Sequence, residues 1–287
     1  MKVLLTNDDG IQAQGLQTLR RALVRVPGIE LVVIAPDGNR SAMARSITTM
    51  RPLCVDEVDL DDGTIGYATD GTPVDCVRLA NLGLVDGFEA ELIVSGINHG
   101  ANLGDDITYS GTVAAALEGV ILGLPAIAVS QQSDAREMDL RLSERFSFDE
   151  GARFVARVIE EIGDMPLPTG TLLNVNCPAG EATGVQVTRL GKRIYRDELT
   201  LTEPSDAAPI PRAEADAGGA GSRRRRYWVY GRDHGFHDEP GTDLAAVAAG
   251  DIAVTPLHFD LTDAAGMDAL ERHNLGRLLA PAAEEVE

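Results

Sequence analysis

The sequence has few cysteines and no long apolar run. Three cysteines stand far apart among 287 residues, and no two of them form a Cys-x-x-Cys pair. This spacing argues against a zinc ribbon or a disulfide scaffold and is typical of a reducing compartment, so we expect a cytoplasmic protein. No stretch approaches the roughly 20 apolar residues that a membrane-spanning helix needs. The first apolar run, which starts at Val3, is too short for a secretory signal, so no membrane partner is expected.

Positive charge is also scarce. The chain carries 45 acidic and 25 basic residues, a formal net charge of −20, and its lysines are Lys2 and Lys192. Such a surface repels phosphate backbones, so a nucleic acid polymer is not an expected partner. An acidic, lysine-poor surface suits a protein kept soluble in high salt. A GC-rich genome would also replace lysine by arginine, so both explanations stay open.

Short apolar runs alternate with helical patterns through most of the chain. Buried strands are expected at residues 2–6, 31–35, 92–95, 126–130 and 172–176. Helical spacing of apolar residues between them predicts βαβ units, and hence an α/β fold with a mostly parallel sheet. Residues 51–67 predict a hairpin beside the sheet, whereas 190–227 are long, polar and Gly-rich. Ligands of such sheets bind at the carboxyl ends of the strands.

An acidic pair follows the first expected strand. Asp8 and Asp9 precede Gly10, which relieves the turn. Two adjacent carboxylates repel each other, and a hard cation such as Mg²⁺ or Mn²⁺ would offset that repulsion through oxygen ligands. The alternative is a turn whose Asx side chains cap the first helix.

Two further loops carry polar groups at the same expected edge. After the second strand, residues 35–42 include Arg40, a candidate phosphate donor, and Ser41, a neutral oxygen ligand. After the third, residues 94–104 interleave glycine with Asn98, whose carbonyl oxygen suits a hard metal. His99 could act as a base, or it could be a hydrogen-bonded bystander. Turn residues alone would also explain both loops.

A helix start completes the set. Ser110, Gly111 and Thr112 open a helical pattern that runs to residue 122. Ser and Thr cap helices, and the free N–H groups of a helix start also bind phosphate. The segment is not a P-loop, because the Gly-x-x-x-x-Gly-Lys pattern is missing. Asp105 and Asp106, just before it, are best interpreted as loop anchors.

Together these pieces predict metal-assisted hydrolysis of a phosphate ester. Two carboxylates, a hydroxyl and an amide can hold one divalent ion, and a helix start can hold an anion beside it. Such an ion polarises a phosphoryl oxygen and lowers the pKa of a coordinated water. One of the aspartates can accept that water's proton.

The same motifs resemble the SurE family, the stationary-phase survival proteins that act as 5′/3′-nucleotidases. The resemblance extends over most of the chain and rests on these segments: LLTNDDGI (4–11), APDGNRSA (35–42), GTPVDCV (71–77), VSGINHGANLG (94–104), YSGTVAAALEG (109–119), LNVNCP (173–178) and VTPLHFDLT (254–262).

The resemblance implies an architecture. The family fold is Rossmann-like, a three-layer αβα arrangement with a mostly parallel sheet. It implies a catalytic core over 1–189, a protruding hairpin or flexible insertion over 190–230, and a C-terminal extension over 231–287 that is exchanged between subunits. Homodimers and homotetramers are the usual assemblies. Residues 190–227 are longer and richer in Gly and Arg here than in the family.

The resemblance also implies residue roles. The substrates are nucleoside 5′- and 3′-monophosphates, and short polyphosphate is the alternative. One divalent ion, Mg²⁺ or Mn²⁺, is held in each subunit by Asp8, Asp9, Ser41 and Asn98, and one of the two aspartates is also the base. The turn of Ser110, Gly111 and Thr112 binds phosphate, and Asn102 faces the substrate. His99 and Ala101 occupy variable positions and receive no role.

Three other classes are weaker matches. A haloacid-dehalogenase-type phosphatase needs one residue between its two aspartates, whereas Asp8 and Asp9 are adjacent. A receiver-like signalling domain needs a lysine after a late strand, and the two lysines of this chain do not fit. A plain nucleotide-binding module would bind without releasing phosphate. The run Arg223–226 is a solvated loop, an intersubunit contact or a landing site for polyphosphate.

Overall fold

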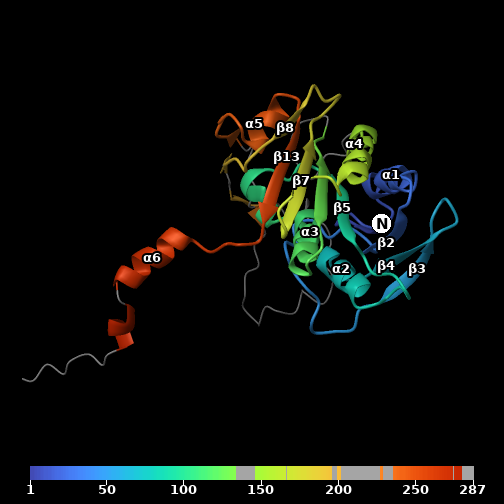
Figure 1. Ribbon diagram of the computed structural model, residues 1–287, viewed down its shortest axis with the longest axis horizontal. Helices are drawn as coiled ribbons and strands as arrows, with labels where there is room; N and C mark the ends of the chain where they lie inside the picture. The colour runs from blue at the N-terminus through green and yellow to red at the C-terminus, as the bar shows by residue number, and fades with distance from the viewer. Residues whose placement is uncertain are drawn as a thin grey trace, which may run out of the picture.

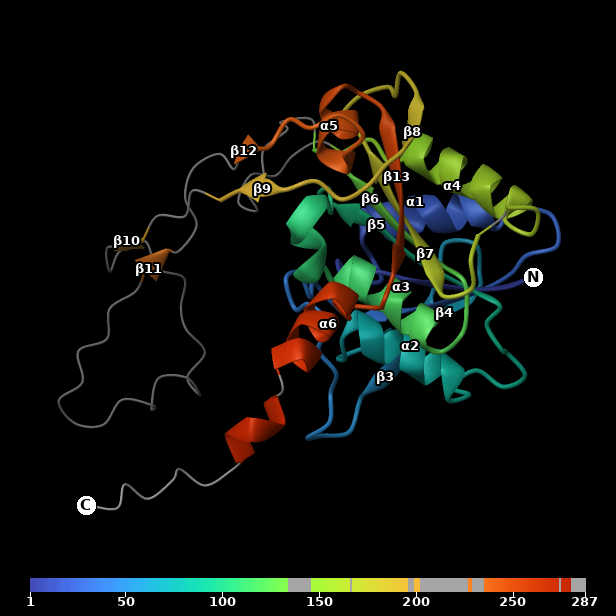
Figure 2. The same cartoon turned by 60° about the vertical axis from the view of Figure 1, so that its left-hand side comes forward.

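The computed structural model describes residues 1–133, 146–165, 167–195, 199–201, 227–228, 235–273 and 275–279. Within them a nine-stranded sheet has the strand order β3-β4-β2-β1-β5-β6-β7-β13-β8. Helices cover both faces of this sheet, as Figures 1 and 2 show. The predicted α/β fold, a three-layer Rossmann-like arrangement around a mostly parallel sheet, is confirmed.

The middle of the sheet is parallel. Its six strands are, in sheet order, β4 (Ile65–Thr69), β2 (Glu30–Pro36), β1 (Lys2–Thr6), β5 (Leu92–His99), β6 (Ala126–Gln131) and β7 (Thr171–Cys177). Every strand expected from an apolar run is present, and β5 continues beyond its predicted end. These runs are almost continuously apolar because both faces of a parallel sheet are buried.

Both edges of the sheet are antiparallel to its centre. The hairpin expected within 51–67 forms as β3 (Val55–Asp59) and β4, and β4 joins it to the sheet through β2. At the other edge, β13 (Ile252–His258) pairs antiparallel with β7, and β8 (Val185–Val187) pairs parallel with β13. The last part of the chain therefore completes the same sheet.

Two helix pairs enclose the sheet. On one face α1 (Gln14–Leu23) packs with α4 (Asp149–Glu161), and on the other α2 (Pro73–Asn81) packs with α3 (Gly111–Ile121). Helix α3 lies very close to β5, because a Cβ at Gly119 would lie 2.6 Å from Ile93 Cγ1. This close approach fixes where the start of α3 lies above the sheet.

Smaller elements surround this body: η1 (Gly104–Thr108), β9 (Arg193–Ile194), β10 (Thr200–Leu201), β11 (Tyr227–Trp228), β12 (Gly235–Phe236), α5 (Asp243–Ala248), α6 (Ala264–His273) and η4 (Leu275–Leu279). Helix α6 extends away from the body and buries none of its residues (Figures 1 and 2). Most of the predicted insertion 190–227, including residues 223–226, lies outside the described residues. In the part of the chain that is described, no helix is long and apolar enough to cross a bilayer.

Candidate active site

The predicted site residues gather at the carboxyl edge of the sheet. Strand β1 lies between β2 and β5, so the loops that follow these three strands are neighbours. The start of α3 meets them, since Gly111 lies against Asp8. Polar groups from four separate motifs therefore share one region, as expected at the carboxyl ends of parallel strands.

Asp8 is the most buried carboxylate of this region, with 3% of its surface exposed. The Thr112 hydroxyl donates a hydrogen bond to Asp8 Oδ1, and a Cβ at Gly111 would lie 2.8 Å from Asp8 Oδ2. Burial, and then the charge of Asp9, raise the pKa of Asp8 to about 6. Among the described residues no lysine or arginine forms an ion pair with Asp8. Its negative charge is therefore poorly compensated by the protein.

Asp9 is held by the two neighbouring loops. Its Oδ2 accepts the backbone N–H of His99 at 2.9 Å, and its Oδ1 accepts Asn39 Nδ2 at 3.3 Å. The ring nitrogen Nδ1 of His99 lies 3.4 Å from the same Oδ2. The side chain is therefore fixed between the loop after β2 and the loop after β5.

The loop that carries Ser41 is placed by backbone contacts. A Cβ at Gly10, where φ is +105°, would lie 3.0 Å from Gly38 Cα, so two glycines let the loops touch. The Arg40 N–H donates to the Asp8 carbonyl oxygen at 2.6 Å. The Arg40 guanidinium pairs with Asp37 at 2.6 Å. Ser41 therefore directly follows Arg40, whose backbone contacts Asp8. The Arg40 side chain is paired with Asp37 of its own loop.

Asn98 is the next-to-last residue of β5 and precedes His99, whose N–H contacts Asp9. Its Nδ2 donates to the Gly100 carbonyl oxygen at 2.8 Å, which orients the side-chain amide. The side-chain oxygen is then the atom that can serve as a cation ligand, as the sequence predicts.

The start of α3 is directed at Asp8. Ser110 is its N-cap, because Ser110 Oγ accepts the Val113 N–H at 3.1 Å. The Thr112 hydroxyl donates to Asp8, and the role of the Ser110–Thr112 turn in binding phosphate stays a prediction. Helix starts stabilise negative charge, so this placement favours an anion at the acidic pair.

Asn102 belongs to a buried amide network. Its Nδ2 donates to Ser130 Oγ at 2.8 Å, and its carbonyl oxygen accepts both Asn174 Nδ2 and Asn176 Nδ2 at 3.0 Å. This network ties the loop after β5 to β6 and β7. The structure thus assigns Asn102 a structural contact, and its predicted role in facing the substrate stays a prediction. Its partners Asn174 and Asn176 lie in the segment LNVNCP, which is distinguished in the sequence only by its resemblance to the family.

Anchors of the loop before α3 come from late in the chain. Asp106 accepts Arg193 Nε at 2.7 Å and the Tyr195 hydroxyl at 2.9 Å, consistent with the anchoring interpretation of its motif. Sequence reasoning missed Asp243, which is fully buried and accepts the N–H groups of Gly104 and Gly191 at 2.8 Å each. A lone acidic residue so far along the chain carries no local signal of this contact.

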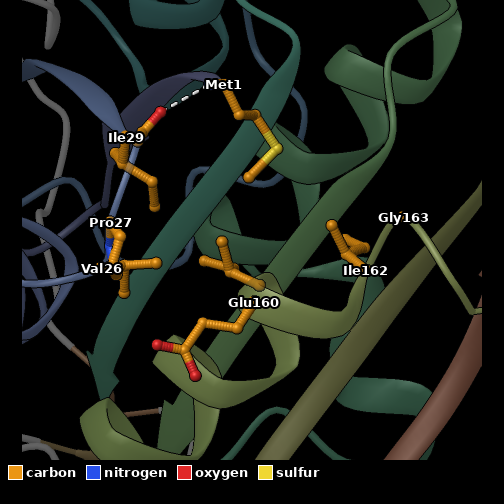
Figure 3. A pocket seen from close by; sticks show the side chains of 9 residues that line it. Met1, Val26, Pro27, Ile29, Glu160, Ile162 and Gly163 are labelled. Carbon is orange, nitrogen blue, oxygen red and sulfur yellow. Dashed lines mark hydrogen bonds between the residues drawn. The ribbon is translucent and has the colours of Figure 1, made fainter.

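A cavity elsewhere on the molecule lacks a comparable set of polar side chains. It measures about 480 Å³ and lies beside Met1, at the opposite edge of the sheet (Figure 3). Its lining is mainly apolar, with Val26, Pro27, Ile29 and Ile162 around a single carboxylate, Glu160. It offers no convergent set of polar groups, so the carboxyl edge is the better candidate site.

The donor set at the carboxyl edge fits a hard divalent cation. Among the described residues no three His, Cys, Asp or Glu side chains form a metal-binding cluster. The predicted ligand set does not need one, because it combines two carboxylates with the neutral oxygens of Ser41 and Asn98. Burial and the charge of Asp9 raise the pKa of Asp8, and a cation bound beside Asp8 would offset this unfavourable charge.

The chain is similar to known proteins over nearly its whole length. The family model described as "Survival protein SurE" matches residues 3–197. Two proteins named 5′-nucleotidase SurE are similar over nearly their whole length. The one from Rubrobacter xylanophilus is 48% identical and covers 97% of this chain and 99% of its own. The one from Pelobacter propionicus is 43% identical, with 94% and 98% covered. The solved structure of the SurE protein from Aquifex aeolicus gives a TM-score of 0.73 at 35% identity, covering 95% of this chain and 99% of its own.

Proposed function

The chain belongs to the SurE family, and from that membership we propose that it is a divalent-metal-dependent phosphatase of nucleoside 5′- and 3′-monophosphates. The observation that carries the proposal is the acidic pair. Asp8 and Asp9 are adjacent, held at the carboxyl end of β1, and without an arginine or lysine ion pair among the described residues. The pair keeps a negative charge that a bound cation would offset, and that cation would in turn attract a phosphoryl group.

Different residues of the chain would hold the metal ion and accept the proton. Asp8, Asp9, Ser41 and Asn98 would hold one Mg²⁺ or Mn²⁺ ion, which when bound polarises a phosphoryl oxygen and lowers the pKa of a water. One of the two aspartates takes the proton of the attacking water.

The start of α3 would hold the substrate phosphate. The Gly111 N–H and the Ser110 hydroxyl supply its donors, and the helix dipole favours the anion. The Thr112 hydroxyl contributes indirectly, by orienting Asp8.

The assembly is part of the proposal. We propose that 1–189 form the catalytic core, that 190–230 form a protruding insertion, and that 231–287 are exchanged between subunits of a homodimer or homotetramer. Helix α6 supports the exchange, because it buries none of its residues and extends away from the body (Figure 1). A helix that leaves all of its residues unburied against the described part of its own chain gains apolar burial when another copy covers it.

Phosphate release tests the proposed activity. Nucleoside 5′- and 3′-monophosphates and short polyphosphate are incubated with the protein in Mg²⁺, Mn²⁺ or EDTA. We expect metal-dependent release from the monophosphates and none in EDTA. Release that is equal in EDTA, or no release with either metal, would contradict the proposal.

A further inference from the structure

Three aromatic rings form a cluster at one side of the acidic pair. The ring of His99 lies 5.2 Å from Phe146 and 4.9 Å from Phe148, measured between centroids, and Phe146 stacks on Phe148 at 5.5 Å. Phe148 is buried against α1, where the absence of a side chain at Gly15 leaves room for its ring. The cluster joins the end of β5 to the start of α4 and fixes the position of the His99 ring.

This cluster adjoins the catalytic carboxylates. Both the backbone N–H and the ring Nδ1 of His99 lie within 3.4 Å of Asp9 Oδ2. Phe146 and Phe148 come from the α1 and α4 side of the sheet, whereas Asp8 contacts α3 on the other side. A phosphate ester bound at the acidic pair would therefore have the α3 start on one side and aromatic rings on the other.

The rings are open to solvent in part. The His99 side chain is 28% exposed and Phe146 is half-buried. Inorganic phosphate or polyphosphate gains little from apolar rings and binds cationic groups instead. The arginines of the loop after β2 are paired with carboxylates: Arg40 with Asp37, Arg45 with Glu118 and Arg51 with Asp70. Among the described residues, the surroundings therefore favour a substrate that carries an aromatic group.

We propose that His99 and Phe146 form a platform on which the base of a nucleoside monophosphate stacks while its phosphate lies at the acidic pair. This inference rests on the proposed function and adds the residues that hold the leaving nucleoside. Every base has a π face, so stacking on aromatic rings tolerates all four bases. The larger purine rings are expected to bind more tightly than pyrimidines.

Matched substitutions separate stacking from the contact with Asp9. His99→Asn keeps a nitrogen donor near the position of Nδ1 and removes the ring, whereas His99→Phe keeps a ring and removes the donor. Phe146→Leu keeps apolar volume and removes the second ring. For each variant, kcat/KM is measured with Mn²⁺ for AMP, CMP and ribose 5-phosphate, which lacks a base. The readout is the ratio of AMP to ribose 5-phosphate, because general damage to the site lowers both values.

We expect His99→Asn and Phe146→Leu each to lower this ratio by about fivefold or more, mainly through KM for AMP. His99→Phe should keep the ratio within about twofold of wild type, whatever its effect on kcat. An unchanged ratio in His99→Asn and Phe146→Leu, or a loss in His99→Phe equal to that in His99→Asn, would overturn the platform. Wild-type protein that hydrolyses ribose 5-phosphate as well as AMP would refute the platform but leave phosphatase activity standing. Wild-type protein that hydrolyses neither would refute both.

Discussion

Replacing Asp8 by Asn should stabilise the metal-free protein at neutral and alkaline pH. Asp8 is buried next to Asp9, and its folded-state pKa is raised from 3.8 to about 6. A carboxyl whose pKa is raised by folding opposes folding once it is ionised. Its unfavourable contribution is absent below pH 4, grows as the pH rises from 4 to 6, and is complete above pH 6.

The magnitude follows from the pKa difference. Each pKa unit corresponds to 1.36 kcal/mol, so ionised Asp8 lowers the free energy of unfolding by about 3 kcal/mol. Asn carries no charge and can still accept the Thr112 hydroxyl through its oxygen. In EDTA at pH 8, Asp8→Asn should therefore unfold at a temperature higher by roughly 5–10 °C.

Thermal unfolding in EDTA from pH 4 to pH 8, at one protein concentration, measures the difference between wild type and variant. The difference should vanish near pH 4 and reach its full size above pH 6. Mn²⁺ at 100 times its Kd should then stabilise the wild type by about 2.7 kcal/mol and the variant much less. A difference that does not change with pH, or a variant that is less stable at pH 8, would refute this reasoning.

Three other predictions concern the site and the surface. Thr112→Val should weaken Mn²⁺ binding by about tenfold or more in calorimetry, because Asp8 loses a charge-assisted hydrogen bond, whereas Thr112→Ser should bind nearly as wild type. Gly111→Ala should remove most phosphatase activity, because its Cβ would displace Asp8, whereas Gly163→Ala, which meets open space, should not. The melting temperature should rise from low to molar KCl if the net charge of −20 reflects salt adaptation, and a monotonic fall would rule that out.

Much of the fold is encoded locally. A central parallel strand such as β1 is buried on both faces, so its sequence is a short apolar run that ends where the loop begins. The antiparallel placement of β13 between β7 and β8 has no such signal, because strand order depends on partners far away in sequence. The three residues of β8 are too few to show any periodicity.

In the site, too, some features could be predicted from the local sequence and others could not. Asp8, Asp9 and Asn98 could be predicted because each lies near the carboxyl end of an apolar strand run. The contact of Thr112 with Asp8 could not, because it depends on how closely Gly119 lets α3 approach the sheet. The packing of Phe146 on His99 joins residues 47 positions apart, so no local sequence pattern indicates it.

The activity of Asp9→Asn is the most direct test of the account. Phosphate release from AMP is measured at saturating Mn²⁺, with Asp86→Asn, an exposed position ahead of β5, as the matched control. Circular dichroism confirms that both variants are folded. We predict that Asp9→Asn lowers kcat/KM by about a hundredfold or more, because a ligand of the ion is lost, and that Asp86→Asn stays near wild type. A folded Asp9→Asn protein with wild-type turnover would contradict the assignment of the acidic pair as the catalytic centre.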